Sequence, residues 1–530
     1  MVSDVEHWFL SARERGNPAT DLADRTDGDL AEPLVHGAEY FARLVDAVHG
    51  LAPGDQLFFA DWRGDPDERL RAEGPTVAEL LSGAAARGVH VRGLVWRSHW
   101  DALSFSKAQN RSLDREVESG GGRVVLDQRV RLFGSHHQKF VVLRHVADPA
   151  RDVAFLGGID LCHGRRDDAS HAGDPQPVPM AAAFGPTPAW HDVQLQVRGP
   201  AVAEVETVFR ERWADPTSPV HLNPFAWLRG RLRGARLDPQ PLPEQLPPPP
   251  PAGPHRVQLL RTYPVRWARY PFAPRGERSV ARGYAKTLTR ARRLVHLEDQ
   301  YLWSADVVRF LAEALVREPE LHLVAICPRR PQQDGLMSRA QRVGQHSALG
   351  ALRRAGGERV HVFDVESPAG LPVYVHAKAC VVDDVWAAVG SDNVNRRSWT
   401  HDSELTGAVL DTTLDEREPR DPAGLGEGAR TFARDLRLRL TREHLDLAPD
   451  GSQDAELLDP GRCVAALERS AAGLEAWHAG GRVGPRPPGR LRPHRTGELS
   501  RWERSWAAPL HRVFNDPDGR PRRLRRAGEF

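Results

Sequence analysis

The amino-acid sequence predicts an α/β protein of two lobes that repeat the same order of elements. Short apolar runs of strand length alternate with amphipathic helical patterns, which indicates a sheet covered by helices. A strand that begins with a histidine and a lysine two residues apart occurs twice, at His137 and at His376. Between these strands, residues 239–254 include five consecutive prolines. Such a segment is an extended spacer, so it divides the chain into two parts.

The size and composition of the chain fit this organisation. A chain of 530 residues with 40% apolar and 27% charged residues is expected to be a globular protein of several domains. Its formal net charge of +2 gives no overall signal for binding nucleic acid or a membrane. We expect an N-terminal extension at 1–35, a first lobe at 36–238, a proline-rich linker at 239–254, a second lobe at 255–450 and a basic C-terminal tail at 451–530.

The first lobe opens with a β-α-β pattern. Thr76 is a suitable N-cap for a helix at 77–86, because Glu79 stands in the capping-box position. The other predicted elements are helices at 38–51, 102–118 and 202–213 and strands at 56–60, 89–96, 140–143, 153–156 and 190–197.

The second lobe repeats this order. We predict helices at 280–291 and 307–316 and strands at 294–297, 321–327, 379–382 and 385–389. The run Asp192-Val-Gln-Leu-Gln-Val also aligns with Glu404-Leu-Thr-Gly-Ala-Val. A repeat this coarse is weak evidence alone, but each copy carries one His-Lys pair. The sequence therefore indicates an internal duplication.

The more complete His-Lys motif lies in the second lobe. His376, Lys378 and Asp383 have the spacing H-x-K-x4-D, and Ser391 and Asn393 follow the next apolar run. Because His376 and Lys378 are two residues apart, they point to the same side of a strand. An imidazole can attack or protonate a phosphate while an ammonium group neutralises its oxygens. The motif therefore predicts phosphoryl chemistry.

The first lobe carries a modified copy of the motif. His137 and Lys139 precede one apolar run, a second run follows after an insertion, and Asp160 stands where the second lobe has Asn393. Lysine is rare in this chain, so chance would give roughly 0.17 His-x-Lys pairs in this composition, against the two observed. Two surface pairs without a function are the alternative interpretation.

The first copy also departs from the motif at its aspartate. Position 144 is Arg144, and an insertion lengthens the turn that follows. Asp148 or Asp152 could supply the missing carboxylate, which we expect to serve the fold more than the chemistry. His137 and Lys139 are intact, so the first half of the site is still expected to react.

Together these motifs resemble the phospholipase D superfamily. The resemblance rests on HHQKFVV with FLGGIDLCHGR, on EDQYLW, and on YVHAKACVVDD with GSDNVNRRS, all of which look like the phosphatidylcholine-cleaving branch. It implies an α/β fold of two pseudo-symmetric phospholipase D-type lobes. Each lobe would be a mixed sheet flanked by helices, with the active site between the lobes.

The resemblance also implies a mechanism. His137 is expected to attack phosphorus and form a phosphohistidine, while His376 acts as general acid and then as general base. The sequence alone would permit the reverse assignment. Lys139, Lys378 and Asn393 are expected to hold the phosphoryl oxygens as negative charge builds on them.

A histidine in either role needs an acceptor that orients its other nitrogen. Asp192 and Glu404, at equivalent places in the two lobes, are our candidates, and ordinary strand-end acids are the alternative. The expected catalytic residues are His137, Lys139, His376, Lys378, Asn393, Asp383, Asp192 and Glu404. The expected substrate-binding residues are Gly158, Asp160, Ser391 and Gln300.

The expected function is that of a phospholipase D-type phosphodiesterase. It would hydrolyse or transphosphatidylate glycerophospholipids and give phosphatidic acid and an alcohol. A cardiolipin-synthase-like phosphatidyltransferase is the nearest alternative, but such enzymes usually carry N-terminal membrane helices, which we do not find. A nuclease of the superfamily is less favoured, because the chain has no basic, aromatic-interleaved groove signal outside its tail. Two intact His-Lys pairs argue against a non-enzymatic binding protein.

We expect no cofactor and no metal. The two lysines supply the positive charge that a cation would bring, and the sequence shows no H-E-x-x-H, clustered Cys/His or EF-hand spacing. The expected partner is a phospholipid at a membrane surface rather than nucleic acid, and the protein is expected to be a monomer.

The expected location is the cytoplasm. The first residues lack the basic and apolar regions of a signal peptide, and no apolar run approaches the roughly 18 residues that span a bilayer. Three of the four cysteines lie in strand-like apolar contexts and are expected to be buried thiols. Residues 481–530 contain thirteen arginines and five acids. A solvated or docked tail is the simplest interpretation, and peripheral contact with anionic lipid headgroups is the alternative.

Overall fold

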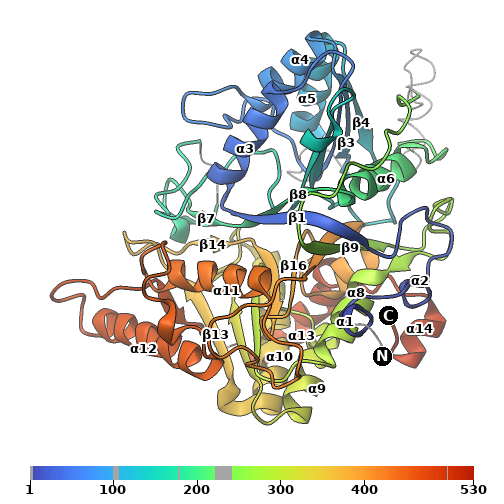
Figure 1. The fold of residues 1–530 in the computed structure, drawn as a ribbon. Coiled ribbons are helices and arrows are strands. Elements are labelled where there is room, and N and C mark those ends of the chain that lie inside the picture. Colours follow the sequence, from blue (N-terminus) through green and yellow to red (C-terminus); the bar gives the residue numbers. More distant parts are fainter. Residues whose placement is uncertain (1–3, 99–106, 177–179, 221–240, 498) are drawn as a thin grey trace.

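The computed structural model describes residues 4–98, 107–176, 180–220, 241–497 and 499–530 (Figure 1). A single mixed sheet runs through both lobes. From the centre outward, the first lobe has the strand order β1 (Thr26–Val35), β8 (Val193–Arg198), β6 (Val153–Gly157), β5 (Phe140–Arg144), β2 (Gln56–Asp61), β3 (His90–Trp96) and β4 (Arg123–Asp127). The second lobe has the order β9 (His255–Tyr263), β17 (Glu404–Asp411), β16 (Trp386–Gly390), β15 (Lys378–Val382), β11 (Leu294–Asp299), β12 (His322–Ile326), β13 (Val360–Val365) and β18 (Leu491–Pro493).

Corresponding strands of the two lobes also pair in the same sense. β2, β3 and β4 are parallel, and β2 pairs antiparallel with β5. Likewise, β11, β12 and β13 are parallel, and β11 pairs antiparallel with β15. β1 and β9 pair antiparallel at the centre and join the two halves. These pairings confirm the predicted α/β fold of two pseudo-symmetric lobes.

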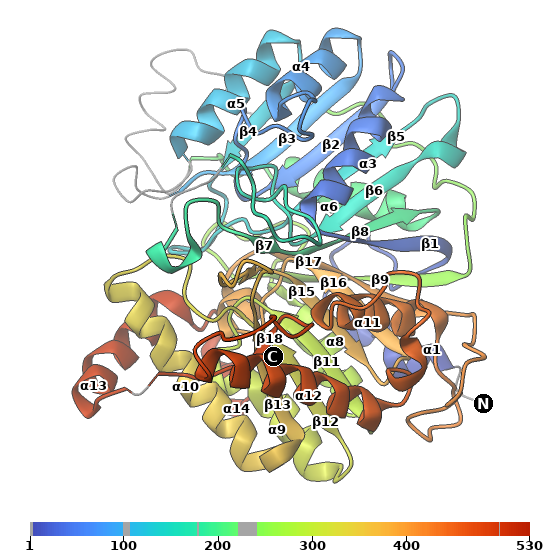
Figure 2. The ribbon, with the colours of Figure 1, turned by 90° about the vertical axis from the view of Figure 1, so that its left-hand side faces the viewer.

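Helices cover both faces of the sheet (Figures 1 and 2). In the first lobe, Leu57 and Phe59 pack against α3 (Gly37–His49), α4 (Val77–Ala86) and α5 (Lys107–Ser119), whereas Phe58 packs against α6 (Ala201–Trp213). In the second lobe, α8 (Ser279–Leu288), α9 (Ala305–Arg317) and α10 (Leu336–Gly356) cover one face, and α11 (Thr431–His444) and α12 (Pro460–Ala479) cover the other. The capping box predicted at Thr76 and Glu79 is present at the start of α4.

One apolar core crosses the lobe boundary. It contains Val142 and Leu195 from the first lobe together with Val381 and Ala387 from the second. Since tightly packed interiors resist deformation, this shared core fixes the position of one lobe relative to the other. The site between the lobes is therefore built on a rigid support.

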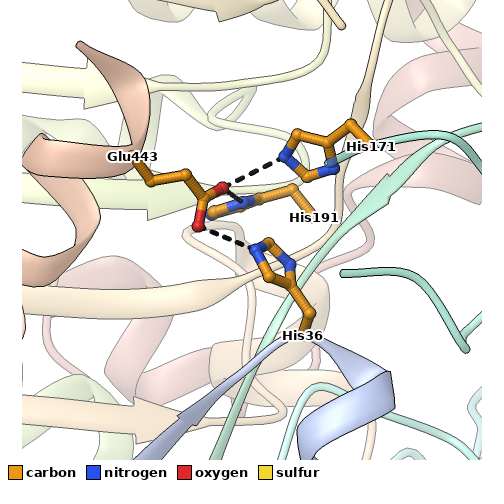
Figure 3. A group of neighbouring side chains, drawn as sticks. All are labelled: His36, His171, His191 and Glu443. Carbon is orange, nitrogen blue, oxygen red and sulfur yellow. Dashed lines mark hydrogen bonds and ion pairs between the residues drawn. The ribbon is translucent and has the colours of Figure 1, made fainter. Parts of the chain in front are cut away.

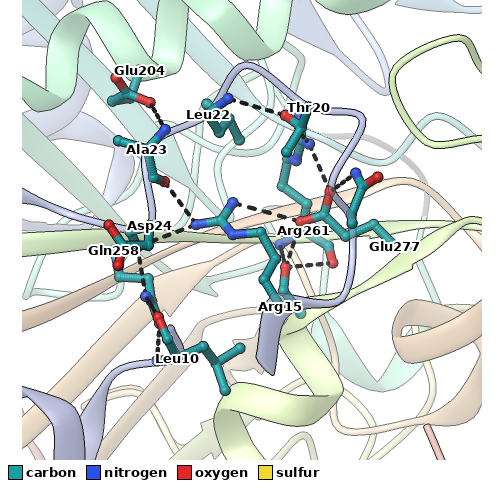
Figure 4. Close-up of polar contacts among 12 residues, drawn as sticks. Leu10, Arg15, Thr20, Leu22, Ala23, Asp24, Glu204, Gln258, Arg261 and Glu277 are labelled. Carbon is teal, nitrogen blue, oxygen red and sulfur yellow. Dashed lines mark hydrogen bonds and ion pairs between the residues drawn. The ribbon is translucent and has the colours of Figure 1, made fainter. Parts of the chain in front are cut away.

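The N-terminal segment is folded against both lobes (Figure 4). It forms α1 (Asp4–Trp8), α2 (Ala12–Arg15) and, at residues 26–35, the central strand β1. The buried Arg15 donates to the carbonyl oxygens of Ala23 and Asp24, at 3.0 and 3.2 Å. Ala23 N donates to Glu204 Oε2 of α6, and Gln258 Nε2 of β9 donates to Leu10 O. Residues that sequence reasoning assigned to an extension thus form part of the sheet and of the lobe contact.

The linker and the tail are likewise held against the protein. Gln56 Nε2 donates to Glu244 O at 3.0 Å, so the proline-rich segment lies along the first lobe. In the tail, α12 joins the core and β18 pairs with β13. The buried Phe530 packs in the second-lobe core. All four cysteines are buried and free. In the described ranges we find no helix with the length and apolar character needed to cross a membrane.

Candidate active site

The two His-Lys pairs occupy equivalent places at the boundary between the lobes. His137 and Lys139 lie just before β5, and His376 lies just before β15, which begins at Lys378. The partners β2 and β11 run antiparallel to β5 and β15, so each pair lies at the carboxyl end of the neighbouring strand. The carboxyl ends of strands are the usual location of ligand sites in α/β sheets.

Each histidine is oriented by an acid of the opposite lobe. His376 Nδ1 lies 2.7 Å from Oδ2 of Asp192, which belongs to the first lobe. His137 Nδ1 lies 2.9 and 3.1 Å from the two carboxylate oxygens of Glu404, which belongs to the second lobe. Because a carboxylate accepts the Nδ1 proton, Nε2 of each imidazole is the nitrogen left to attack or to exchange a proton. The lobes therefore complete each other's half-site.

Backbone pairing across the boundary holds these contacts in place. β14 (Tyr374–Val375) and β7 (Trp190–His191) form a short parallel pair, and His376 N donates to His191 O at 2.7 Å. In the same way, His137 N donates to Ser403 O at 2.9 Å. Both acids were predicted from the sequence. That each acid contacts the histidine of the opposite lobe was not predicted.

The two lysines face a common space. Lys139 Nζ donates to His137 O at 2.8 Å and lies 3.5 Å from Asp160 Oδ1. Lys378 Nζ donates to His376 O and lies 3.4 Å from Gln300 Oε1. Burial and the positive charge of Lys139 lower the pKa of Lys378 to about 8, although Asp192 opposes the shift. Two buried ammonium groups that repel each other form a ready binding place for an anion.

His376 is held in its neutral form. Burial and the charge of Lys378 lower the pKa of His376 to about 3, and Asp192 opposes the shift. The pKa of Asp192 lies below its usual value, because His376 and Lys378 outweigh the effect of its burial. At neutral pH the pair is therefore a carboxylate that accepts a hydrogen bond from a neutral imidazole.

The two half-sites differ where one has Asn393 and the other Asp160. Asn393 is buried, and its Oδ1 has no hydrogen-bond partner among the residues that the structure describes. Asp160 lies against Lys139 and, at 3.4 Å, against Arg165 Nη2. Burial opposes its ionisation, but Lys139 and Arg165 lower its pKa. Burial and Asp160 raise the pKa of the adjacent Asp61 well above its usual range, so Asp61 is the protonated member of this pair.

Ser391 and Gly158, which we predicted to bind substrate, lie against the orienting acids. Ser391 Oγ donates to Glu404 Oε2 at 2.6 Å and accepts from Leu405 N at 3.0 Å. At Gly158 a Cβ would lie 2.1 Å from Asp192 Oδ1, so the glycine leaves room for that carboxylate. The Ser391 hydroxyl thus holds the acid Glu404 by a hydrogen bond, and the absence of a side chain at Gly158 makes room for the acid Asp192.

Asp383 lies outside the site, which corrects its predicted catalytic role. It follows β15 at the end opposite to Lys378, and its carboxylate accepts from the backbone N atoms of Arg292, Arg293 and Leu294 at 2.7–2.8 Å. It therefore holds the start of β11.

In the first lobe, Arg144 occupies the corresponding turn. It is fully buried and donates to Asp152 Oδ2 at 2.7 Å and to Glu206. We considered two acids as replacements for the missing carboxylate. Asp152 is buried beside Arg144, whereas Asp148 is exposed. This network too supports the fold, away from His137.

Comparisons with known proteins agree with this geometry. A family model described as "Phospholipase D" matches residues 66–225, and one described as "Cardiolipin synthase, PLD-like domain" matches residues 284–417. The chain belongs to the phospholipase D superfamily. Each lobe thus carries one phospholipase D-like domain.

Similar curated proteins are longer than this chain. It is 24% identical to "Phospholipase D alpha 2" of Oryza sativa subsp. japonica, over 78% of this chain and 63% of that protein. It is 25% identical to "Phospholipase D2" of Bos taurus, over 79% of this chain and 54% of that protein. It therefore spans less than two thirds of either relative. Among solved structures, a phosphatidylserine synthase of Haemophilus influenzae Rd KW20 has the same fold, with a TM-score of 0.50, 12% identity, and coverage of 98% of this chain and 97% of that one.

Aromatic side chains line this phospholipase D-like centre, and sequence reasoning missed them. The ring of Trp190 lies 4.9 Å from that of His376, and Trp62 lies 6.3 Å from His137. Arg165 stacks over Trp190 at 3.8 Å. The sequence held one signal, because Trp190 stands two residues before the predicted acid Asp192.

Gln300 connects the centre to a neighbouring pocket. Its Nε2 donates to the hydroxyl of Tyr374 at 2.9 Å, while its Oε1 lies near Lys378. Both side chains also line a pocket with the stacked rings of Tyr301 and Trp303 and with four arginines, at positions 329, 330, 342 and 495. Gln300 therefore lies between Lys378 and the arginine-lined pocket.

Two groups of described side chains have the arrangement of metal ligands, and both lie outside the His137–His376 centre. The first is His36, His171, His191 and Glu443, and the second is His191, Glu298 and His444. The residues come from segments far apart in the sequence, so no motif of closely spaced ligands could predict these groups.

Proposed function

We propose that the protein is a phosphodiesterase that cleaves the headgroup ester of a glycerophospholipid through a phosphohistidine intermediate. The observation that carries this proposal is the crossed pair of half-sites. Each holds a histidine whose Nδ1 is bound to an acid of the other lobe, at 2.7 Å for His376 and 2.9 Å for His137. A reaction with one attacking and one protonating imidazole needs this duplicate geometry.

The proposed reaction has two displacements at phosphorus. In the first, Nε2 of one histidine attacks phosphorus, the bond to the headgroup oxygen breaks, and the other histidine gives its proton to the leaving alcohol. In the second, that other histidine takes a proton from water, whose oxygen attacks phosphorus, and the phosphorus–nitrogen bond breaks. Phosphatidic acid leaves, or a phosphatidyl alcohol if an alcohol replaces water. Lys139, Lys378 and the amide of Asn393 stabilise the charge on the oxygens.

The order of the two histidines is open to a direct test. The family resemblance gives the attack to His137. His376 is the other candidate, because it is held neutral in the free protein and the neutral imidazole is the nucleophilic form. Rapid acid-free quenching with a short-chain substrate, followed by peptide mass spectrometry, should find the phosphatidyl group on one of the two. The modified histidine is the nucleophile.

A phosphatidyltransferase is the second candidate. It would use the same first step and differ only in the acceptor. The four arginines of the pocket beside Gln300 favour it, since they suit a headgroup or acceptor with negative charge of its own. The pocket therefore predicts a preference for phosphatidylglycerol, whose headgroup carries no cation, over phosphatidylcholine, whose headgroup carries a quaternary ammonium group.

One assay separates these functions from a nuclease. The purified protein is incubated with phosphatidylcholine or phosphatidylglycerol vesicles plus ethanol, and separately with single-stranded DNA, without added divalent metal. We expect phosphatidic acid and phosphatidylethanol from the wild type and from His90→Ala, which changes an exposed histidine away from the site. His137→Ala and His376→Ala should form neither. Intact lipid together with cleaved DNA would refute the proposal.

A further inference from the structure

Behind the catalytic centre, four side chains converge on one point (Figure 3). His36 follows β1, His171 lies in the loop before β7, His191 belongs to β7, and Glu443 belongs to α11 of the other lobe. Glu443 lies 2.8 Å from His36 Nε2, 3.1 Å from His171 Nε2 and 3.3 Å from His191 Nδ1. All four ligand atoms lie within 4.8 Å of one another.

The distances from Glu443, 2.8–3.3 Å, are slightly shorter than those between the ligand atoms of a tetrahedral metal site. Four ligand atoms about 2.1 Å from a zinc ion lie about 3.4 Å from one another. The three imidazole rings have centroid separations of 5.0, 5.1 and 5.8 Å, and two of the three pairs meet nearly edge to face. Rings that share one metal ion point their nitrogens inward in this way, whereas rings packed as a hydrophobic cluster need not.

Two of the histidines have carboxylate partners on their outer side. His171 Nδ1 lies 3.4 Å from Asp167 Oδ2, and His191 Nε2 lies 2.5 Å from Glu298 Oε2. Glu298 is itself held by His444 Nε2 at 2.7 Å. A histidine that binds a metal usually donates its other N–H to such a carboxylate, which fixes its tautomer and orientation.

Both ring nitrogens of His171 and of His191 face a carboxylate. In a metal site, each ring donates one N–H to its outer carboxylate and directs the lone pair of its other nitrogen to the ion.

The cluster is also accessible to an ion. His36 and Glu443 line a groove on the surface between the lobes, together with Glu39, Asp168 and Arg439. The side chains of His171 and His191 are fully buried behind it, and that of Glu443 is 9% exposed. An ion could therefore reach the cluster through the groove without passing the catalytic centre.

We propose that His36, His171, His191 and Glu443 bind one divalent transition-metal ion, with zinc as the best match, and that this ion clamps the two lobes together. Three imidazoles and one carboxylate suit zinc in a closed structural site better than they suit calcium or magnesium, which prefer oxygen ligands. The ion is structural and takes no part in the phosphoryl chemistry.

The clamp would act on the half-site of His376 through the backbone. His36 N donates to Asp192 O at 2.8 Å, and His191 O accepts from His376 N at 2.7 Å. Two ligands are thus bonded to the backbone of the catalytic histidine and of the acid that orients it. Binding of the ion to the folded state alone would also stabilise the whole protein.

Metal analysis of untagged full-length protein tests the proposal. The protein is loaded with Zn²⁺, dialysed against a weak chelator and measured by elemental mass spectrometry. We expect close to one zinc per chain in the wild type and at least a tenfold loss in His171→Ala and in Glu443→Gln. The matched control is His361→Ala, which removes another buried histidine whose Nδ1 lies 2.7 Å from a glutamate, Glu468. It should keep its zinc.

A second measurement does not depend on the variants being folded. Wild-type protein loaded with Co²⁺ should show the intense visible absorption of tetrahedral cobalt, and zinc should abolish it. Zinc should also raise the melting temperature of the wild type and not that of Glu443→Gln. Less than about a tenth of an ion per wild-type chain after loading, or an octahedral cobalt spectrum, would overturn the proposal. So would full zinc content in both ligand variants.

Discussion

The two half-sites share their reacting groups and differ around them. Each has a histidine, a lysine and an acid from the opposite lobe, with histidine–carboxylate distances of 2.7 and 2.9 Å. Around this shared part, Asp160 replaces Asn393, Gly158 replaces Ser391, and Arg144 replaces Asp383 in its turn. The half-sites therefore keep the same histidine and lysine, whereas the side chains at the Asn393 and Asp160 positions and the groups that support the acids differ.

The divergence is compensated inside each lobe. Asp160 places a carboxylate beside Lys139, but Arg165 and Asp61 share the same cluster, so the negative charge is balanced. Arg144 is equally matched by Asp152 and Glu206. Buried charges persist only when they are paired and hydrogen-bonded, and both replacements satisfy that condition.

The largest expected effect comes from the histidines, where the half-sites should be equivalent. His137→Ala and His376→Ala should each lower kcat by about 10⁴-fold or more, because the two residues act as one unit. The double variant should be little worse than either single one. Headgroup release from phosphatidylglycerol vesicles measures this. Two effects that multiply would contradict a shared reaction.

The orienting acids should come next. Asp192→Asn and Glu404→Gln keep the shape of each side chain but remove the charge that orients the imidazole, so each should lower kcat by about 10²- to 10⁴-fold. Ser391→Ala should have a smaller effect, since it removes one hydrogen bond to Glu404. If each acid acts on the histidine of the opposite lobe, Asp192→Asn should alter the NMR titration of His376 and leave that of His137 unchanged.

The parts of the site that are local in sequence could be predicted, and those that depend on contact between the lobes could not. His-x-Lys spacing fixes both side chains on one side of a strand, so the two pairs were visible. The contact of Asp192 with His376 spans 184 positions, and the repeat did not show which acid pairs with which histidine. The proposed metal ligands at positions 36, 171, 191 and 443 were invisible for the same reason.

The sequence also misled where a residue type fits two roles. Asp383 matches the motif, but it binds the backbone at the start of β11. Residues 1–35 looked polar and separate, yet residues 26–35 form the central strand β1, whose partners lie more than 150 positions away. Strand pairing at that separation leaves no periodic signal beyond the strand itself.

The exchange of Asn393 and Asp160 tests the difference between the half-sites directly. Asn393→Asp puts a carboxylate at a buried position whose oxygen has no described hydrogen-bond partner, and it should raise KM and lower kcat/KM by about 10- to 100-fold. Asp160→Asn removes a charge that is already balanced and should change kcat/KM less. Steady-state kinetics on the two variants and on the double exchange measure this. Equal losses in both single variants would mean that the half-sites are not distinguished by charge.

The pH dependence should report the lysine of the second half-site. Because its pKa is lowered to about 8, Lys378 is charged below that pH and loses its charge above it. kcat/KM reflects groups of the free enzyme, so it should fall by about tenfold between pH 7 and pH 9. Lys378→Arg should lose this alkaline limb, because arginine stays charged, even if its activity at pH 7 is lower. An unchanged limb in Lys378→Arg would assign it to another group.

The smallest effect on activity is expected at the two turns, where stability should change instead. Asp383→Asn weakens three hydrogen bonds to backbone N–H groups and should lower the free energy of unfolding by about 1–3 kcal/mol. Arg144→Met leaves the buried carboxylates of Asp152 and Glu206 without their arginine partner and should lower the free energy of unfolding by about 3–5 kcal/mol. Denaturant unfolding measures both, and kcat per folded molecule should stay near that of the wild type. A large loss of kcat in folded Asp383→Asn would return that residue to the catalytic group and make the second half-site the more specialised of the two.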